Sequence, residues 1–211
     1  MTRTASPVPL LAALLLAPAA PAAAQSPVNE AIGTWRLTCV ADRMTDRTAC
    51  ALLHAQPADR SEPGRPSLAL EVIDRGGRLV PAVTARDLTL EGASRGLLAL
   101  TGTVQLRFPP NRMIEMPCGL EGRSLVCAPR GEEAARAEAE LPAADRVLLR
   151  VVATGGGGGT VEPVELPLRG TREALARFRQ QVPPGTAPQA ADQPGLDARE
   201  ILQRLRQLFG Y

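Results

Sequence analysis

The sequence predicts a mainly β protein: an antiparallel β-sandwich with one or two short helices and an appended C-terminal amphipathic helix. Short runs in which apolar and polar residues alternate, such as Trp35 to Cys39 and Val104 to Phe108, have the period of half-buried strands. Segments rich in Gly, Pro, Asp and Ser separate these runs at short intervals, as in an all-β domain. Four cysteines in two close pairs fit the hairpins of such a sheet.

The chain divides into five predicted parts. Its first residues have the features of a secretory signal peptide: Arg3, an apolar run from Leu10 to Ala17, and the small residues Ala22 to Ala24 before a cleavage site. An uncleaved anchor is the alternative, but this run would reach only about 12 Å into a hydrocarbon core of about 30 Å. The parts are a signal peptide (1–24), a leader (25–31), a β domain (32–181), a linker (182–195) and a C-terminal helix (196–211).

The cysteines indicate an oxidising compartment, because an even number in an exported chain favours disulfides. Three pairings are open to four cysteines. Cys39 and Cys50 flank a polar, turn-like segment, and so do Cys118 and Cys127, so each close pair can bridge adjacent strands of a hairpin. We therefore predict the disulfides Cys39–Cys50 and Cys118–Cys127. A zinc site is disfavoured, because its paired ligands lie two to four residues apart.

The first half of the β domain contains two predicted hairpins. In the first, a polar turn from Asp42 to Thr48 joins the Trp35–Cys39 strand to a strand in which Cys50, Leu52 and His54 share one face. The second hairpin consists of the strands Leu68–Val72 and Leu79–Thr84 around the turn Asp74–Gly77. The adjacent glycines of that turn accept positive φ angles, as tight hairpin turns require.

The second half continues the sheet and adds the two helices. Pro109 and Pro110 end the strand at Phe108, because proline cannot donate to a ladder. The remaining strands are expected at Met113–Cys118 and Ser124–Ala128 around a Gly119–Gly122 turn, and at Val147–Ala153 and Val161–Leu168 around the glycine run Gly155–Gly159. Helices are expected at Gly131–Glu140 and at Thr171–Gln181, the latter with Thr171 as its N-cap.

The C-terminal tail has the pattern of an amphipathic helix. Asp197 and Glu200 form a capping box. The apolar stripe consists of Ile201, Leu202, Leu205, Leu208 and Phe209. A helix of this length is marginal in isolation and needs a partner surface. Three alternatives are open: it folds back onto the domain, docks on another protein, or lies on an anionic membrane surface.

Composition excludes several functional classes. All 24 basic residues are arginines, so a Schiff-base lysine and a phosphate-loop lysine are absent. The chain has one histidine and five aromatic residues, which excludes two-histidine metal sites and leaves little to stack nucleobases. The formal charge of +2 provides no electrostatic footprint for nucleic acid. We therefore expect no metal, no cofactor and no nucleic-acid partner.

Few residues are candidates for chemistry. His54 is the only side chain suited to shuttling protons near neutral pH, but its position in a strand favours a local structural role. Glu115 and Glu121 could form a carboxylate pair near the second cysteine pair, although solvated surface charges are the simpler interpretation. Arg107, Arg112 and Arg123 could gather beside the same pair and bind an anion.

The order of these motifs resembles the invasion-associated locus B family. The motifs are Trp35-x-x-x-Cys39, Cys50-Ala51-Leu52, a second cysteine pair followed by a short helix, and Pro163–Leu168 leading into the Thr171–Arg179 helix. The resemblance covers residues 32 to 181. It implies an exported bacterial β-sandwich protein without established catalytic activity, whose founding member was linked to entry into host erythrocytes. The wider spacing of Cys118 and Cys127, the glycine run and the tail depart from that pattern.

Together these features predict a non-enzymatic, periplasmic or secreted protein that binds a macromolecule or interacts with a host. Its partner would be a protein or an envelope component, reached through strand edges or the C-terminal helix. No transmembrane segment is expected; peripheral membrane contact would use the same helix. The alternatives are a periplasmic hydrolase using His54 and a carboxylate, and an anion-binding envelope module.

Overall fold

A computed structural model describes residues 28–45, 47–59, 68–86, 102–152 and 162–184. The predicted signal peptide, the glycine run and the C-terminal helix with its apolar stripe lie outside these residues. The described strands are β1 (Val28–Ile32), β2 (Trp35–Asp42), β3 (Arg47–Pro57), β4 (Ala69–Arg75), β5 (Arg78–Ala85), β6 (Thr103–Arg107), β7 (Ile114–Glu121), β8 (Ser124–Cys127), β9 (Arg146–Val152) and β10 (Val164–Pro167). The helices are α2 (Gly131–Glu140), the 3-10 turn η2 (Leu141–Ala143) and α3 (Thr171–Gln181).

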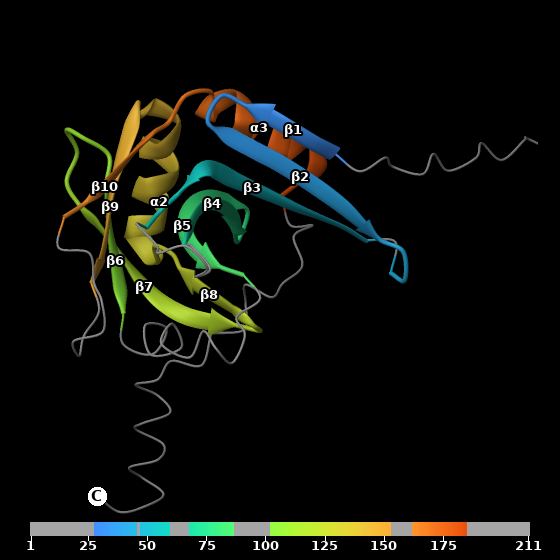
Figure 1. The fold of residues 1–211 in the computed structure, drawn as a ribbon, viewed down its shortest axis with the longest axis horizontal. Helices are drawn as coiled ribbons and strands as arrows, with labels where there is room; N and C mark the ends of the chain where they lie inside the picture. The colour runs from blue at the N-terminus through green and yellow to red at the C-terminus, as the bar shows by residue number, and fades with distance from the viewer. Residues whose placement is uncertain (1–27, 46, 60–67, 87–101, 153–161, 185–211) are drawn as a thin grey trace, which may run out of the picture.

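The strands form one antiparallel sheet, in the order β1-β2-β3-β4-β5-β8-β7-β6-β9-β10. Most neighbours in this order are also neighbours in sequence, and every pair is antiparallel. The sheet curls around a common interior (Figure 1). The mainly antiparallel β class predicted from the alternating pattern is therefore confirmed.

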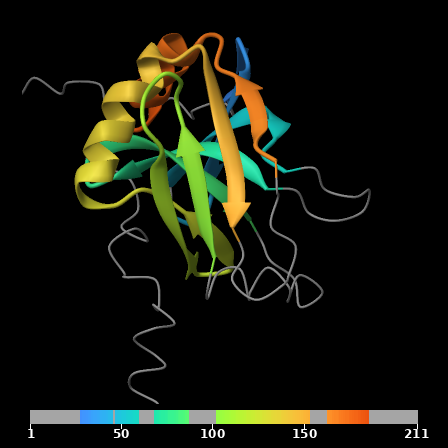
Figure 2. The ribbon, with the colours of Figure 1, turned by 90° about the vertical axis from the view of Figure 1, so that its left-hand side faces the viewer.

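The core lies inside this curl and draws residues from both halves of the sheet. Its largest fully buried side chains are Trp35, Phe108, Leu37, Leu52, Leu70, Leu106, Ile114, Met116, Leu125, Leu141, Leu149 and Val72. On the strands these residues alternate with outward-facing ones, as the period of two requires. Both helices lie in the upper part of the molecule (Figures 1 and 2). Ala174 and Phe178 of α3 and Ala137 of α2 join the same core.

The turn between β10 and α3 meets the turn between β1 and β2 at close range. A Cβ atom on Gly33 would lie 2.1 Å from the carbonyl oxygen of Arg169, and one on Gly170 would lie 3.1 Å from Cα of Gly33. Both glycines also have positive φ, +59° and +75°. Only residues without a Cβ allow these two backbones to touch.

The predicted helix boundaries at Thr171–Gln181 and Gly131–Glu140 are correct, but the N-cap assignment is wrong. Gly170 is the N-cap of α3, and Thr171 is its first helical residue. The hydroxyl of Thr171 donates to the carbonyl oxygen of Leu168 at 2.8 Å and accepts from the indole Nε1 of Trp35 at 3.0 Å. This threonine therefore anchors the helix to β2 instead of capping it.

Three other boundaries differ from the prediction. Part of the expected leader is a strand, since Val28–Ile32 pairs with β2 as β1. The expected linker begins with Val182, which is buried in the core. The expected Gly119–Gly122 turn is shorter, because β7 continues to Glu121 and pairs with Ser124. In each case contacts with the rest of the fold order residues whose local pattern is weak.

Candidate functional site

Two hairpins of the sheet are each closed by a disulfide. Cys39 of β2 is bonded to Cys50 of β3, and Cys118 of β7 is bonded to Cys127 of β8. In both hairpins the bonded cysteines are directly opposite each other in the register. The structure thus contains the two predicted pairings, and no cysteine is free.

The β2–β3 hairpin extends beyond the other strands, at the right of Figure 1. Its base is buried at Trp35 and Leu37, whereas every residue from Val40 to Thr45 is exposed. Val40 is 57 % exposed and Met44, in the turn, is 91 % exposed. The apolar side chains of Val40 and Met44 are thus exposed to solvent, in the part of the hairpin that directly follows the Cys39–Cys50 bond.

On the outward side of this hairpin β3 is apolar as well, whereas β2 contributes Arg36, Thr38 and Val40 to the same side. Cys50, Leu52 and His54 share one face, as predicted, and the structure shows that this face is the core side. The intervening Ala49, Ala51 and Leu53 therefore point outward. A strand with one face in solvent normally carries polar residues there. We call Val40, Met44, Ala49, Ala51 and Leu53 the hairpin face. This surface is the strongest candidate site among the described residues.

Sequence reasoning missed the hairpin face, although a signal was present. Residues 49 to 55 read Ala-Cys-Ala-Leu-Leu-His-Ala, a run with no charged residue on either set of alternate positions. The prediction placed only one set, Cys50, Leu52 and His54, on a common face. The other set, Ala49, Ala51 and Leu53, indicates a binding surface only when the structure shows which side of the sheet is covered. Helix α3 packs on the opposite side of β2 and β3.

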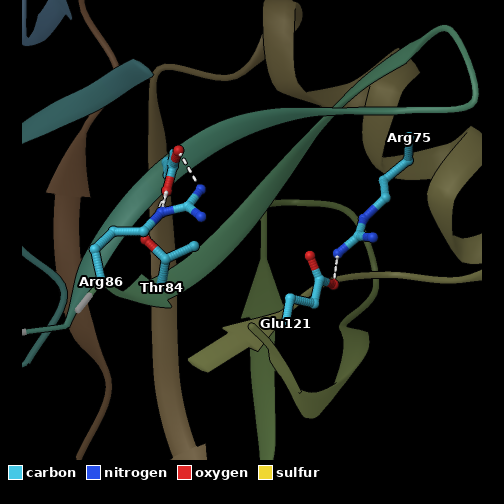
Figure 3. A network of polar contacts seen from close by, with 5 residues as sticks. Arg75, Thr84, Arg86 and Glu121 are labelled. Carbon is cyan, nitrogen blue, oxygen red and sulfur yellow. Dashed lines mark hydrogen bonds and ion pairs between the residues drawn. The ribbon is translucent and has the colours of Figure 1, made fainter. Parts of the chain in front are cut away.

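A buried charged cluster borders the hairpin face. Leu53 is opposite Glu71 of β4, and the carboxylate of Glu71 accepts from the Thr84 hydroxyl at 2.7 Å. Arg86 also binds it through two hydrogen bonds of 3.1 and 2.7 Å (Figure 3). Such a two-point pairing compensates a buried carboxylate for lost hydration. The cluster therefore has a structural role at the border of the hairpin face.

The turn of the β2–β3 hairpin is organised by Asp42. The backbone amide of Met44 donates to Oδ1 of Asp42 at 2.7 Å. This hydrogen bond favours the ionised carboxylate and so lowers the pKa of Asp42 below its ordinary value, with Thr45 contributing in the same direction. Asp42 thereby fixes the backbone that presents Met44 to solvent.

His54 has a structural environment. It is 5 % exposed, and its Nε2 lies 2.8 Å from the carbonyl oxygen of Pro167. Because a carbonyl only accepts, Nε2 donates to it, and Nδ1 lies 3.1 Å from the backbone amide nitrogen and 3.2 Å from the carbonyl oxygen of Gln56. Both ring nitrogens are thus engaged with backbone groups, and the ring edge packs against Trp35.

The three candidate arginines are not gathered beside the second disulfide. In the β6–β7 register, Arg107 lies at the Ile114 end of β7, where Arg112 precedes the strand. Arg123 lies at the other end, in the turn after Glu121. Arg107 is also bound to the carbonyl oxygen of Asn111 at 2.8 Å. The expected cluster is not formed, because the eight residues of β7 separate Arg112 from Arg123.

The two candidate carboxylates also have separate environments. Glu121 forms an ion pair with Arg75 (Figure 3), while Glu115 is an exposed residue of β7 opposite Gln105. Within the described ranges no group of three His, Cys, Asp or Glu side chains is placed to hold a metal ion. A search of the same residues found no helix long and apolar enough to span a membrane.

Comparison with known proteins finds matches among solved structures. No family model matches the sequence, and no curated protein matches it. Among solved structures, the crystal structure of invasion associated protein b from Bartonella henselae is similar, with a TM-score of 0.46 and 16 % sequence identity. The similarity covers 72 % of this chain and 95 % of that chain. That protein bears the name of the family that the order of motifs resembles.

Proposed function

We propose that this protein is an exported, non-enzymatic envelope or secreted protein that binds another macromolecule through the hairpin face. The observation that carries this proposal is the β3 strand, which is apolar on both faces while only one of them packs on the core. Val40, Met44 and Ala49 are exposed and Ala51 and Leu53 are half-buried, and apolar residues gathered on a surface in this way commonly mark an interaction site. A protein or another envelope component is the partner that an apolar sheet surface fits.

The disulfide below the exposed turn favours this role. A contact element that is already ordered loses less conformational entropy when it binds than a mobile loop does. Cys39–Cys50 closes the hairpin at the point where its packing on the core ends, and Asp42 holds the turn beyond it. The hairpin face is therefore presented in one arrangement before any partner arrives.

The same disulfides support export, since such bonds form and persist in oxidising compartments. We expect the mature chain to begin at Gln25, after removal of residues 1–24. Intact mass measurement of the protein from the periplasmic and culture fractions tests this. A chain that keeps residues 1–24 and remains in the cytoplasm contradicts it.

The environment of His54 argues against the hydrolase alternative. A general base needs a ring nitrogen that can reach a substrate. Here the Pro167 carbonyl and the Gln56 amide use both nitrogens, and the ring is buried. The separation of Arg107 and Arg112 from Arg123 likewise removes the basis on which the anion-binding alternative rested.

Quantitative capture from envelope extract tests the binding role. The wild-type protein is compared with Met44→Asp and Val40→Asp, which place a charge at exposed positions of the hairpin face. Met113→Asp is the matched control, because Met113 is 41 % exposed and lies outside this face, before β7. We expect one defined set of components to be captured by wild type and control and lost with both hairpin variants. Equal capture by all four proteins would refute the proposed surface.

A further inference from the structure

The two edges of the sheet differ in whether another strand can pair with them. Among the described residues, β1 and β10 are the outermost strands of the sheet. β10 has four residues, follows Pro163 and ends at Pro167. The Pro167 carbonyl already accepts from the Thr34 hydroxyl at 2.9 Å and from His54 at 2.8 Å. Prolines and used carbonyls are common means of closing a sheet edge. β1 has five residues and no proline.

The register identifies which backbone groups of β1 face away from the sheet. Cys39 and Cys50 are opposite residues whose Cα atoms are 4.0 Å apart, the close spacing of a non-hydrogen-bonded pair. The amide and carbonyl of Cys39 therefore point toward β1, where they meet Val28. Because bonded and non-bonded pairs alternate along an antiparallel ladder, Glu30 and Ile32 also bond to β2.

The backbone groups of Asn29 and Ala31 consequently point to the open edge. The two-residue turn at Gly33 and Thr34 leads to the same assignment. The residues that flank such a turn, here Ile32 and Trp35, form a hydrogen-bonded pair. Asn29 and Ala31 are also exposed. Their two amides and two carbonyls form the pattern that an added antiparallel strand would need.

The charges beside this edge indicate which strand would fit. On the inward face, Glu30 is already paired with Arg177 of α3 through hydrogen bonds of 3.2 and 3.1 Å. On the outward face, Arg36 is opposite the small Ala31 and is exposed, and within the described part of the chain no hydrogen bond or ion pair holds it. A long arginine beside an alanine can reach past it to the next strand, where a carboxylate would be its natural partner.

We propose that the free edge of β1 binds an extended acidic segment of a partner protein as an added antiparallel strand, through the backbone of Asn29 and Ala31 and the side chain of Arg36. The inference rests on the proposed binding role but assigns it a second element and a partner chemistry. A second copy of this chain is disfavoured as the occupant, because the full-length antiparallel pairing of two β1 strands places Glu30 opposite its own copy.

Proline substitution at Ala31 tests the edge, because the backbone amide of Ala31 points away from β2, whereas that of Glu30 bonds to β2. Ala31→Pro removes an outward donor and leaves the pairing with β2 intact, whereas Ala31→Val keeps the donor and is the matched control. The probe is a fluorescent, end-capped peptide of four Glu-Val repeats, with a Lys-Val peptide as the charge control. Binding is measured by fluorescence anisotropy on the full-length protein with both disulfides formed.

We expect the Glu-Val peptide to bind wild type and Ala31→Val alike and the Lys-Val peptide to bind neither. Ala31→Pro should weaken binding roughly tenfold, the scale of one or two lost hydrogen bonds. Arg36→Glu should weaken it several-fold at low salt. Amide exchange of Asn29 and Ala31 should slow when the peptide binds.

Two kinds of result would overturn the proposal. One concerns the peptide: no binding of the Glu-Val peptide at about 1 mM protein, or binding that Ala31→Pro leaves unchanged. The other is a dimer, detected by sedimentation, that Ala31→Pro dissociates, since the occupant would then be a second copy. Met44→Asp should bind the peptide as wild type does. A loss of envelope capture by Met44→Asp with unchanged peptide binding therefore separates the hairpin face from the β1 edge.

Discussion

The two disulfide-closed hairpins are alike in covalent structure and different in their surroundings. Their bonded cysteines have Cα atoms 4.0 and 3.9 Å apart, and both bonds join opposite residues. The β7–β8 hairpin lies within the sheet, between β5 and β6, and Glu121 beside its turn is paired with Arg75. The β2–β3 hairpin ends in solvent at Met44.

This difference shows that the same bond can serve two purposes. In β7–β8 the disulfide lies where β5 pairs with β8, and the turn beyond it is joined to β4 by the Arg75–Glu121 ion pair. In β2–β3 the outer part of the hairpin does not pack on the core. The disulfide therefore holds the two strands together where core contacts are absent. The first arrangement stabilises the fold, whereas the second maintains a surface, which is why the hairpin face is the candidate for binding.

The largest expected effect distinguishes the base of the β2–β3 hairpin from its turn. Trp35→Ala removes a side chain that is 1 % exposed, together with its hydrogen bond to Thr171. We expect the free energy of unfolding to fall by about 3–5 kcal/mol, the usual range for a buried aromatic residue. Met44→Ala should change it by less than about 0.5 kcal/mol. Urea denaturation of both variants measures this, and equal losses would show that the turn also packs on the core.

The second effect compares the disulfides directly. Each closes a short loop, of separation 11 or 9, for which chain entropy predicts a loss of about 2.7 kcal/mol on removal. We expect Cys118→Ala with Cys127→Ala to lower the melting temperature of the whole domain. Cys39→Ala with Cys50→Ala should instead speed amide exchange mainly in the β2–β3 turn. Native-state hydrogen exchange distinguishes the two, and identical protection patterns would contradict the assigned roles.

A smaller effect tests what holds the β7–β8 turn. Glu121→Gln removes the ion pair with Arg75, in which both side chains are mostly buried. The expected cost is about 1 kcal/mol, with faster amide exchange around Gly122. Glu115→Gln is the control, because Glu115 is exposed and no ion pair is formed by it among the described residues. If both variants behave as wild type, the Arg75–Glu121 pair does not distinguish this turn from the other.

The smallest effect concerns pH and the β2–β3 turn. The pKa of Asp42 is lowered, above all by the Met44 amide, so the folded state binds its proton less readily than the unfolded state. The contribution to turn stability is therefore present above the ordinary pKa of about 3.8 and is lost as pH falls through the lower folded value. The Met44 amide chemical shift should follow this titration. The shift should be flat over the same range in Asp42→Asn, and an identical titration in that variant would assign it to another group.

Local sequence pattern was enough to predict elements whose periodicity is strong. The β4–β5 hairpin around Gly76 and Gly77 and the bounds of α3 were predicted because alternation and helical period act within a few residues. β1 was missed because five residues with two polar members carry little signal alone. It becomes a strand when β2 supplies its hydrogen bonds. Val182 was missed for a similar reason, since its burial depends on the core beneath α3.

The candidate sites show the same division. His54 was identified from the sequence as a residue in need of explanation, but only the approach of Pro167 shows that its Nε2 joins two distant strands. The arginines near the second cysteine pair are close in sequence, yet an extended strand separates residues by about 3.3 Å each and so spreads them apart. Proximity in sequence is a poor guide to clustering on a strand.

By itself, the sequence determined the class of the protein and its covalent framework. Alternation, turn residues and two close cysteine pairs are local properties, and they led to an antiparallel β domain with the disulfides Cys39–Cys50 and Cys118–Cys127. Tertiary structure decided which side of each strand is covered, because that depends on which distant element packs against it. The covering of one side of β3 by α3 made Leu52 a core residue and left Leu53 on the hairpin face. Thr34 and His54 likewise occupy the Pro167 carbonyl of β10, so β1 is the edge strand that can pair with another strand.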